Sequence, residues 1–272
     1  MCKTLRVSRS GFYAWLGRSE SDRARENREL VEVIRDVFDD SCGIYGSPRV
    51  FRTLRHRGLS CGRHRVARLM RTAGLRSRTR QRFRVKTTDS SHSFPIAPDR
   101  LDRDFRAESA NQVWVSDMAY IHTDEGWLYL AVTMDLFSHK IVGWSMAPSM
   151  HADIVVDALK MAINQRRPEP GLIHHSDRGS QYASEAFRSV LAERGLLASM
   201  SRKGNCYDNA AMESFFHSLK SELVNHEQYR NHSHARAALF DYIEAFYNRQ
   251  RLHSTLDYRS PEAFERACTM VA

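Results

Sequence analysis

Three apolar runs separated by two short turns constrain the fold of this chain more than any other feature. The runs, residues 112–120, 127–137 and 140–146, are rich in Val, Leu, Tyr and Trp, residue types that fit β-strands. Gly126 lies in the first turn, and residues 138–139 form the second. Strands joined by such short connections pair antiparallel with their neighbours. The centre of the chain is therefore predicted to form an antiparallel three-stranded meander.

Beyond the meander, helical and strand patterns alternate. Short apolar runs fit strands, and longer segments with apolar residues three or four positions apart fit amphipathic helices. Gly195 is expected to close one of these helices, because glycine readily adopts the left-handed conformation found just after a helix end. A meander followed by this alternation is the order of an RNase H-like α/β domain. The predicted elements are a helix at 152–163, a strand at 172–175, a helix at 184–194, a strand at 196–200, a helix capped by Asp208 and running to about Leu223, and a last helix at 235–248.

The N-terminal third carries only helical patterns. A helix is predicted at residues 23–40, and Ser47 is expected to cap a second one, with Pro48 at its first position. Ser60 is expected to cap a third helix at 63–72. Two short helices joined by a turn have the form of a DNA-reading helix-turn-helix. The predicted fold class is thus an α/β RNase H-like domain preceded by a small all-α helix-turn-helix domain.

The positive charge of the chain is concentrated in this N-terminal part. The formal net charge is +9, and residues 1–110 hold 25 Lys and Arg against 13 Asp and Glu. Residues 51–88 contain 13 Lys and Arg and no acidic residue. A solvated charged surface usually mixes both signs, whereas a basic stretch without acids favours a nucleic-acid partner. Duplex DNA is therefore the expected partner, and Arg63, Arg65 and Arg68, on the outward face of the third helix, are its expected contacts.

The segment between the two patterns has the composition of a linker. It contains two prolines and many small polar residues, which interrupt both helical and strand periodicity. The sequence therefore predicts a helical DNA-binding domain at 1–86, a linker at 87–104 and a catalytic domain at 105–272.

Three acidic residues stand at or near the ends of predicted elements. Asp117 follows an apolar run, Asp177 follows the fourth strand, and Glu213 lies one turn inside a helix. If the two strands are neighbours, both aspartates reach one edge of the sheet, and Glu213 shares a helix face with Lys220. Carboxylate oxygens are the donors that Mg²⁺ prefers, and two such ions, or Mn²⁺ in their place, can activate a water or a 3′-hydroxyl. Asp117, Asp177 and Glu213 are therefore the candidate catalytic residues and metal ligands.

Cysteine usage and hydropathy restrict the cellular compartment expected for this protein. The five cysteines form no Cys-x-x-Cys motif, which argues against a disulfide framework or a zinc knuckle and fits a reducing cytosol. The sequence has no apolar signal region and no run of 18 apolar residues. We expect a cytoplasmic, nucleoid-associated protein with no membrane partner.

The sequence allows two interpretations for several other residues. His174 and His175 are expected to be packed or hydrogen-bonded rather than to bind zinc with Asp177. Trp114, Trp127 and Trp144 are expected in the core rather than as platforms for base stacking. Three further basic residues are open between phosphate contacts and a solvated surface: Arg178, Arg202 and Lys203.

Five sequence motifs resemble those of a known family. They are Y-G-S-P-R-V at 45–50, N-x-x-W-V-S-D at 111–117, H-S-D-R-G-S-Q-Y at 175–182, G-N-C-Y-D-N-A-A-M-E-S-F-F at 204–216, and N-R-Q-R-L-H-S-T-L-D-Y-R-S-P-E at 248–262. The chain resembles the B subunit, encoded by the downstream reading frame, of bacterial insertion-sequence transposases with an integrase-like DDE core. The resemblance covers nearly the whole chain.

This resemblance implies a specific activity. It implies Asp117, Asp177 and Glu213 as ligands of two Mg²⁺ ions, and Lys220 as a contact to the end of the mobile element. The DNA partners would be the terminal inverted repeats and the target, with a circular intermediate and a homo-oligomer assembled on DNA. Family members are usually made as a fusion with an upstream frame that carries a leucine zipper, whereas this chain has no heptad run. An upstream-frame partner or fusion is therefore expected.

Two other functions compete with this one. A non-catalytic DNA-binding regulator would use only the N-terminal helices, but it would have no need of the three acidic residues. A nuclease that cuts RNA–DNA hybrids would use the same carboxylates, but the arginine-rich N-terminal part and Lys220 favour duplex DNA ends.

Overall fold

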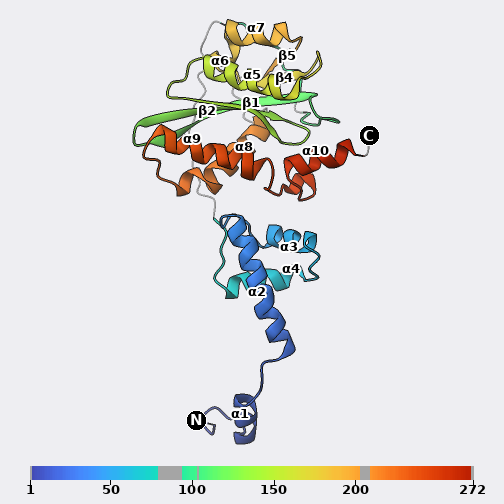
Figure 1. Cartoon of the computed structure of the whole chain (residues 1–272), viewed down its shortest axis with the longest axis vertical. Coiled ribbons are helices and arrows are strands. Elements are labelled where there is room, and N and C mark those ends of the chain that lie inside the picture. Colours follow the sequence, from blue (N-terminus) through green and yellow to red (C-terminus); the bar gives the residue numbers. More distant parts are fainter. Residues whose placement is uncertain (1, 79–93, 103, 203–208, 271–272) are drawn as a thin grey trace. The chain divides into compact units, whose positions relative to one another are not determined.

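The chain forms two compact units, Met1–Arg78 and Thr79–Ala272. The computed structural model describes residues 2–78, 94–102, 104–202 and 209–270 (Figure 1). Residues 87–93 and 103 of the predicted linker lie outside the described residues, so the domain division drawn from the sequence stays a prediction. No helix within the described ranges has the length and apolar character needed to cross a membrane.

The N-terminal unit is all helical. Its helices are α1 (Arg9–Leu16), α2 (Asp22–Asp40), α3 (Ser47–His56) and α4 (Arg63–Thr72). Ser21 caps α2, because its hydroxyl accepts a hydrogen bond from the amide of Ala24. Apolar residues of α2, α3 and α4 meet in one small core, whose buried members are Ile34, Val37, Val50, Leu54, Val66, Leu69 and Met70.

Two predicted caps in this unit are wrong. Gly46, not Ser47, precedes α3 in extended conformation, so Ser47 is the first helical residue and Pro48 the second. Gly62, not Ser60, occupies the same position before α4. Neither helix start has a side-chain cap. Glycine is accepted at such positions almost as readily as threonine, which explains why the serine pattern misled the prediction.

The second unit is built on a five-stranded sheet in the order β3-β2-β1-β4-β5. The first three strands are antiparallel neighbours, and β4 and β5 run parallel to β1. Their bounds are β1 Val113–Thr123, β2 Gly126–Asp135, β3 Ile141–Ala147, β4 Ile173–Ser176 and β5 Leu197–Met200. This meander with added parallel strands is the predicted RNase H-like arrangement, and the predicted fold class is confirmed.

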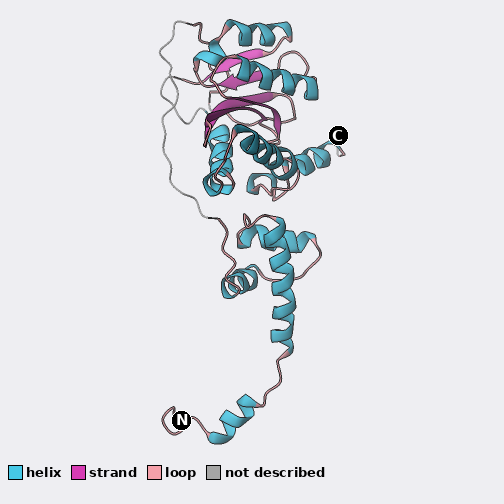
Figure 2. Ribbon diagram, turned by 60° about the vertical axis from the view of Figure 1, so that its left-hand side comes forward, coloured by secondary structure: helices cyan, strands magenta, loops and turns pink. Residues whose placement is uncertain are grey.

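Helices cover both faces of the sheet (Figure 2). On one side, α5 (Asp153–Arg166) and α7 (Glu185–Glu193) share an apolar cluster with Trp114. On the other side, α8 (Ala210–Glu222) and α9 (His232–Phe240) share a cluster with the opposite face of β1 and β2. Figure 1 shows these two layers above and below the strands.

The C-terminal region departs from the prediction. The helix predicted at 235–248 is α9 followed by a π-helical segment, η3 (Asp241–Tyr247), in which i→i+5 bonds replace the α-helical pattern. It is not the last helix, because α10 (Pro261–Thr269) follows it. The short helix α6 (Ser180–Ala183) was also missed. The predicted cap Asp208 lies outside the described residues.

Gly143 marks the closest approach of the sheet to α5. A Cβ at this position would overlap the carbonyl oxygen of Ala158 and press on Ala162. Gly143→Ala should therefore lower the free energy of unfolding by about 1–3 kcal/mol, as overpacking does elsewhere. Urea denaturation measures this change. Ser145→Ala, on the same strand, is the matched control, and an equal loss in both variants would contradict the close approach.

Candidate active site

The pairing of β1 with β4 brings two of the predicted carboxylates to one edge of the sheet. The last paired residues of these parallel strands are Ser116 and Ser176. Asp117 and Asp177 are the next residues along each strand. Parallel neighbours run in the same direction, so both side chains emerge at the same edge, and both line one pocket. The predicted juxtaposition of the two aspartates is what the structure contains.

The electrostatics of this pair reflect their proximity. Burial, and then the charge of Asp177, raise the pKa of Asp117 to about 8. The amide of Met118 opposes this shift by donating a 2.7 Å hydrogen bond to the Asp117 carboxylate. Asp177 accepts a 2.9 Å hydrogen bond from the amide of Gly179, which also lines the pocket. Two carboxylates held together in this way favour a bound proton or a cation between them.

Glu213 is placed differently from the two aspartates. It lies one turn inside α8, where it is exposed, and its charge makes a smaller contribution to the pKa of Asp117 than that of Asp177. Among the described residues, no three His, Cys, Asp or Glu side chains gather closely enough to hold a metal ion. The structure thus brings Asp117 and Asp177 together and leaves Glu213 near them but outside a complete three-carboxylate group.

Lys220, which the sequence predicts on the same helix face as Glu213, interacts with the charge of Asp117. Its ammonium group is 5.4 Å from the centroid of the Tyr120 ring. Burial lowers the pKa of Lys220, and the charge of Asp117 partly restores it. The attraction is mutual, because Lys220 lowers the pKa of Asp117. A cation therefore lies within electrostatic reach of Asp117.

The pocket around the aspartates has a volume of about 540 Å³. Its walls come from β1, β2, the segment after β3 and the segment after β4. Besides the two carboxylates, the lining residues are Met118, Ala119, Tyr120, Trp127, Tyr129, Met150, Gly179, Ser180 and Gln181. A volume of this size is within the range of sites that enclose small ligands.

The tryptophan prediction is correct for two residues and wrong for the third. Trp114 is fully buried and donates to Asp135, and Trp144 is partly buried and donates to Glu244. Trp127, by contrast, is 47% exposed. It sits near the start of β2, opposite His122, on the face of the strand away from the buried Leu128. An apolar residue inside a strand pattern looked like core, but its end position leaves it at the pocket.

His174 and His175 are both buried and hydrogen-bonded to serines. Ser116 lies 2.8 Å from Nε2 of His174, and Ser199 lies 2.8 Å from Nδ1 of His175. Burial, followed by the neighbouring His175, lowers the pKa of His174 to about 3. The two imidazoles thus tie neighbouring strands together beneath the aspartates, in agreement with the packed interpretation.

A buried ion pair that the sequence analysis missed holds the C-terminal end of α8. Arg251 donates two 2.7 Å bonds to the carboxylate of Glu222, and a 3.0 Å bond to Ser218. The hydroxyl of Tyr242 donates to the same carboxylate at 2.7 Å. Arg251 belongs to the tail motif quoted above, which was the only available signal. This network fixes the helix that carries Glu213 and Lys220.

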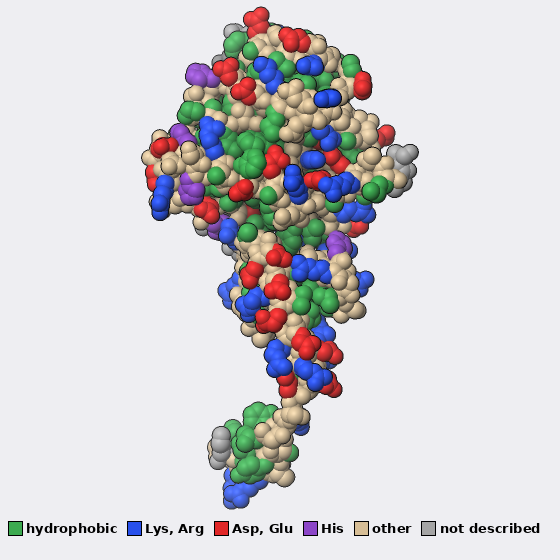
Figure 3. All heavy atoms as spheres, viewed as in Figure 1, with side chains coloured by type: hydrophobic (Ala, Val, Ile, Leu, Met, Phe, Trp, Pro, Cys, Tyr) green, Lys and Arg blue, Asp and Glu red, His purple; other side chains and the backbone are tan. Residues whose placement is uncertain are grey.

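The three arginines predicted to read DNA have different surroundings. Arg63 and Arg68 are exposed on α4. Arg65 is half-buried and donates to Asn27 at 2.8 Å and to Glu26 at 3.2 Å, so it ties α4 to α2. Figure 3 shows acidic and basic side chains intermixed on the visible face of this unit.

Two of the remaining basic candidates have protein partners. Arg178 donates to the carbonyl oxygen of Ser201 at 2.6 Å. Arg202 lies 3.5 Å from Asp99 and 3.3 Å from Asp102. Lys203 lies outside the described residues. The two arginines therefore have structural roles whether or not phosphate approaches them.

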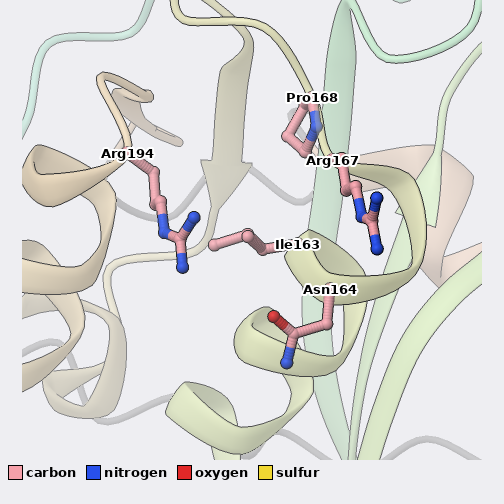
Figure 4. A pocket seen from close by; sticks show the side chains of 5 residues that line it. All are labelled: Ile163, Asn164, Arg167, Pro168 and Arg194. Carbon is pink, nitrogen blue, oxygen red and sulfur yellow. The ribbon is translucent and has the colours of Figure 1, made fainter.

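A second cavity, of about 440 Å³, lies at the other end of α5 (Figure 4). Ile163, Asn164, Arg167, Pro168 and Arg194 line it. It contains no carboxylate, and α5 separates it from the aspartate pocket by roughly 20 Å of helix.

The ion pair of Arg251 with Glu222 makes a testable contribution to stability. Arg251→Met leaves a buried carboxylate without its partner, which should cost about 3–5 kcal/mol. Adding Glu222→Leu to Arg251→Met should recover much of this loss, because the unpaired charge is then gone. Chemical denaturation measures both effects. Arg249→Met, at an exposed neighbour, should cost less than about 1 kcal/mol; equal losses at positions 249 and 251 would contradict the buried pair.

Comparisons with known proteins agree with this architecture. A family model described as an HTH-like domain matches residues 24–83, and models described as Integrase core domain match residues 107–206 and 213–268. The simian T-cell lymphotropic virus intasome, in complex with PP2A regulatory subunit B56 gamma, aligns with a TM-score of 0.49 and 14% identity, over 85% of this chain and 74% of that one. The HTLV-2 integrase catalytic core domain in complex with magnesium aligns with a TM-score of 0.45 and 15% identity, over 59% and 99%. Neither structural likeness bears on chemistry.

Two proteins related in sequence share a much higher percentage of identical residues with this chain. The Insertion element IS600 uncharacterized 31 kDa protein of Shigella sonnei is 44% identical over 264 residues, which is 97% of each chain. The transposase InsF for insertion sequence IS3A of Escherichia coli (strain K12) is 43% identical over 267 residues, covering 97% of this chain and 92% of that one. These identities extend over nearly the whole chain and include the integrase core domain. This chain therefore belongs to the family of insertion-sequence transposases that includes InsF.

Proposed function

We propose that this chain is a metal-dependent DNA strand-transferase that cuts and rejoins the terminal inverted repeats of its own insertion sequence. The observation that carries this proposal is the pair Asp117 and Asp177, which directly follow the last paired residues of β1 and β4 and line one pocket. Membership of the transposase family supports the reaction class. The role of each residue is inferred from its position and chemistry.

The donors in this site suit Mg²⁺. Asp117 and Asp177 supply hard oxygen donors, and the raised pKa of Asp117 means that a second negative charge in the pair is unfavourable unless a cation compensates it. We assign Glu213 as the third ligand, which requires its carboxylate to approach the pair. Two ions at such a site supply an activated oxygen nucleophile and stabilisation of the leaving oxygen. Mn²⁺ has the same preference for oxygen donors and is the expected substitute.

The neighbouring groups would position the DNA strand. Lys220 can hold a phosphate near the carboxylates without replacing them, because its ammonium lies over the Tyr120 ring and interacts with the charge of Asp117. Arg63 and Arg68 present exposed guanidinium groups on α4, in the role of the reading helix. Arg65 could contact phosphate only at the expense of its bonds to α2.

The wider organisation follows from this activity. We assign DNA-end binding to a domain at 1–86, joined by a linker at 87–104 to the catalytic domain at 105–272. Joining two element ends requires at least two copies, so a homo-oligomer on DNA is the proposed active form. The chain would be the downstream-frame subunit, acting with or fused to an upstream-frame partner, in the cytoplasm at the nucleoid.

Loss of any one carboxylate should abolish cleavage. Asp117→Asn, Asp177→Asn and Glu213→Gln each remove a charge that the metals need, and should lower the cleavage rate of an end-sequence duplex in Mg²⁺ by at least about 100-fold. DNA binding should stay close to wild type. Glu193→Gln, at an exposed acid on α7, is the control. Substantial cleavage by one of the three variants would remove that residue from the metal site.

The metal-free site should make stability depend on pH. The folded pKa of Asp117 is about 8 against an ordinary value of 3.8, so the folded state holds this proton more tightly than the unfolded state does. Stability should therefore fall as pH rises from about 4 to about 8. Asp117→Asn should flatten this dependence and raise the melting temperature at pH 8 in EDTA. Mg²⁺ should stabilise the wild type but not this variant, and identical melting profiles would argue against the assignment.

The helix-turn-helix assignment predicts different effects for the three arginines. Arg63→Ala and Arg68→Ala should each weaken DNA binding and reduce the slope of log K against log salt by about 0.9, the value for one phosphate contact. Arg65→Ala should lower the stability of the N-terminal unit and leave the slope unchanged. Fluorescence anisotropy at several salt concentrations measures the slope, and circular dichroism measures stability. A reduced slope for Arg65→Ala alone would reverse the assignment.

A further inference from the structure

An exposed aromatic surface adjoins the aspartate pair. Trp127, on β2, is 47% exposed although it is among the largest apolar side chains. Its ring meets Tyr120 edge-on, with centroids 5.0 Å apart, and His122 at 5.3 Å. Trp127 and Tyr120 line the same pocket as Asp117 and Asp177. Water therefore has access to a rigidly supported indole within the catalytic pocket.

The sheet topology explains how this surface stays open. β4 pairs with β1 only as far as Ser116, so from Asp117 to Thr123 the described residues give β1 a strand neighbour on one side only, β2. Tyr120 lies on this free stretch, and the ammonium of Lys220 stands 5.4 Å from its ring centroid. Two carboxylates and aromatic rings thus line one pocket, and a lysine lies over one of the rings.

We propose that Trp127, supported by Tyr120, stacks on a nucleobase that is unpaired next to the phosphate being cut. This proposal rests on the proposed function, because it places the scissile phosphate at Asp117 and Asp177. Aromatic rings stack on any base, since every base has a π-face, and a paired base inside a duplex cannot offer that face to a protein side chain. Lys220 would neutralise the adjoining phosphate. The pocket volume of about 540 Å³ is in the range that accommodates a small ligand such as one nucleotide.

The charges of the pocket favour a nucleic-acid strand over an apolar protein segment as the occupant. A protein side chain that covered Trp127 would place apolar surface beside two carboxylates and a lysine, whose burial would then be costly. A DNA strand supplies a phosphate for Lys220 and a base for the indole at adjacent positions along its backbone. The chain of contacts from Lys220 to Tyr120 and from Tyr120 to Trp127 therefore places a cation and an exposed indole against the same ring.

Two single-stranded oligonucleotides separate stacking from charge. One is an eight-residue oligothymidylate, and the other has the same phosphates but abasic residues throughout. Binding of each to the full chain is measured by anisotropy in Ca²⁺, which prevents cleavage from complicating the measurement. Trp127→Ala should weaken oligothymidylate binding by about 5- to 150-fold, the effect of losing one stacked base, and leave abasic binding unchanged. Trp127→Phe should retain most of the affinity, and Phe240→Ala, at an aromatic residue of similar exposure on α9, should resemble wild type.

Photo-crosslinking locates the base directly. An end-sequence duplex with 5-iodouracil beside the scissile phosphate should form an adduct at Trp127 or Tyr120, identified by peptide mass spectrometry. Adducts elsewhere only, or equal losses for both oligonucleotides in Trp127→Ala, would overturn the stacking proposal.

The cleavage assay separates failure of this proposal from failure of the proposed function. If Asp117→Asn abolishes cleavage while Trp127→Ala binds oligothymidylate as wild type does, the stacking site is wrong and the strand-transfer function stands. If Asp117→Asn cleaves normally, the proposed function itself is wrong, whatever the oligonucleotides show.

Discussion

The parallel pairing of β1 with β4 is the constraint on which the site depends. A buried chain of polar contacts fixes this pairing: the hydroxyl of Ser116 lies 2.9 Å from that of Thr133 on β2 and 2.8 Å from His174 on β4. These groups are buried, so a shifted register would leave them without hydrogen-bond partners. A slip of one residue would also turn Asp117 to the opposite face of the sheet. The same contacts that align the strands therefore align the carboxylates.

The second support of the site lies on α8. This helix packs its apolar stripe against β1, while Arg251 fixes its far end through Glu222. Glu213 and Lys220 both lie on this helix, so the same packing and the same ion pair position the two side chains.

Periodicity and residue chemistry predicted what depends on local pattern. The strands, most helices and the meeting of Asp117 with Asp177 followed from apolar runs and from the direction of parallel strands. What escaped prediction depends on partners distant in the chain. Helical spacing predicted that Arg65 faces solvent, but its guanidinium donates hydrogen bonds to Asn27 and Glu26 of α2. Trp127 was predicted in the core because it stands in an apolar strand pattern, whereas in the structure its side chain is exposed.

The excess of positive charge lies in the N-terminal part of the chain, and the catalytic part has slightly more acidic than basic residues. Residues 111–272 hold 16 Lys and Arg against 19 Asp and Glu, so the catalytic part has little electrostatic attraction of its own for DNA. Burial and the charge of Asp177 raise the pKa of Asp117, so ionising this carboxyl in the folded protein costs free energy. Functional sites often keep such a cost, because the group that destabilises the free protein is the one that binds its ligand. A basic N-terminal unit can then attract the polyanion, while the acidic pocket stays selective for the cations that its chemistry needs.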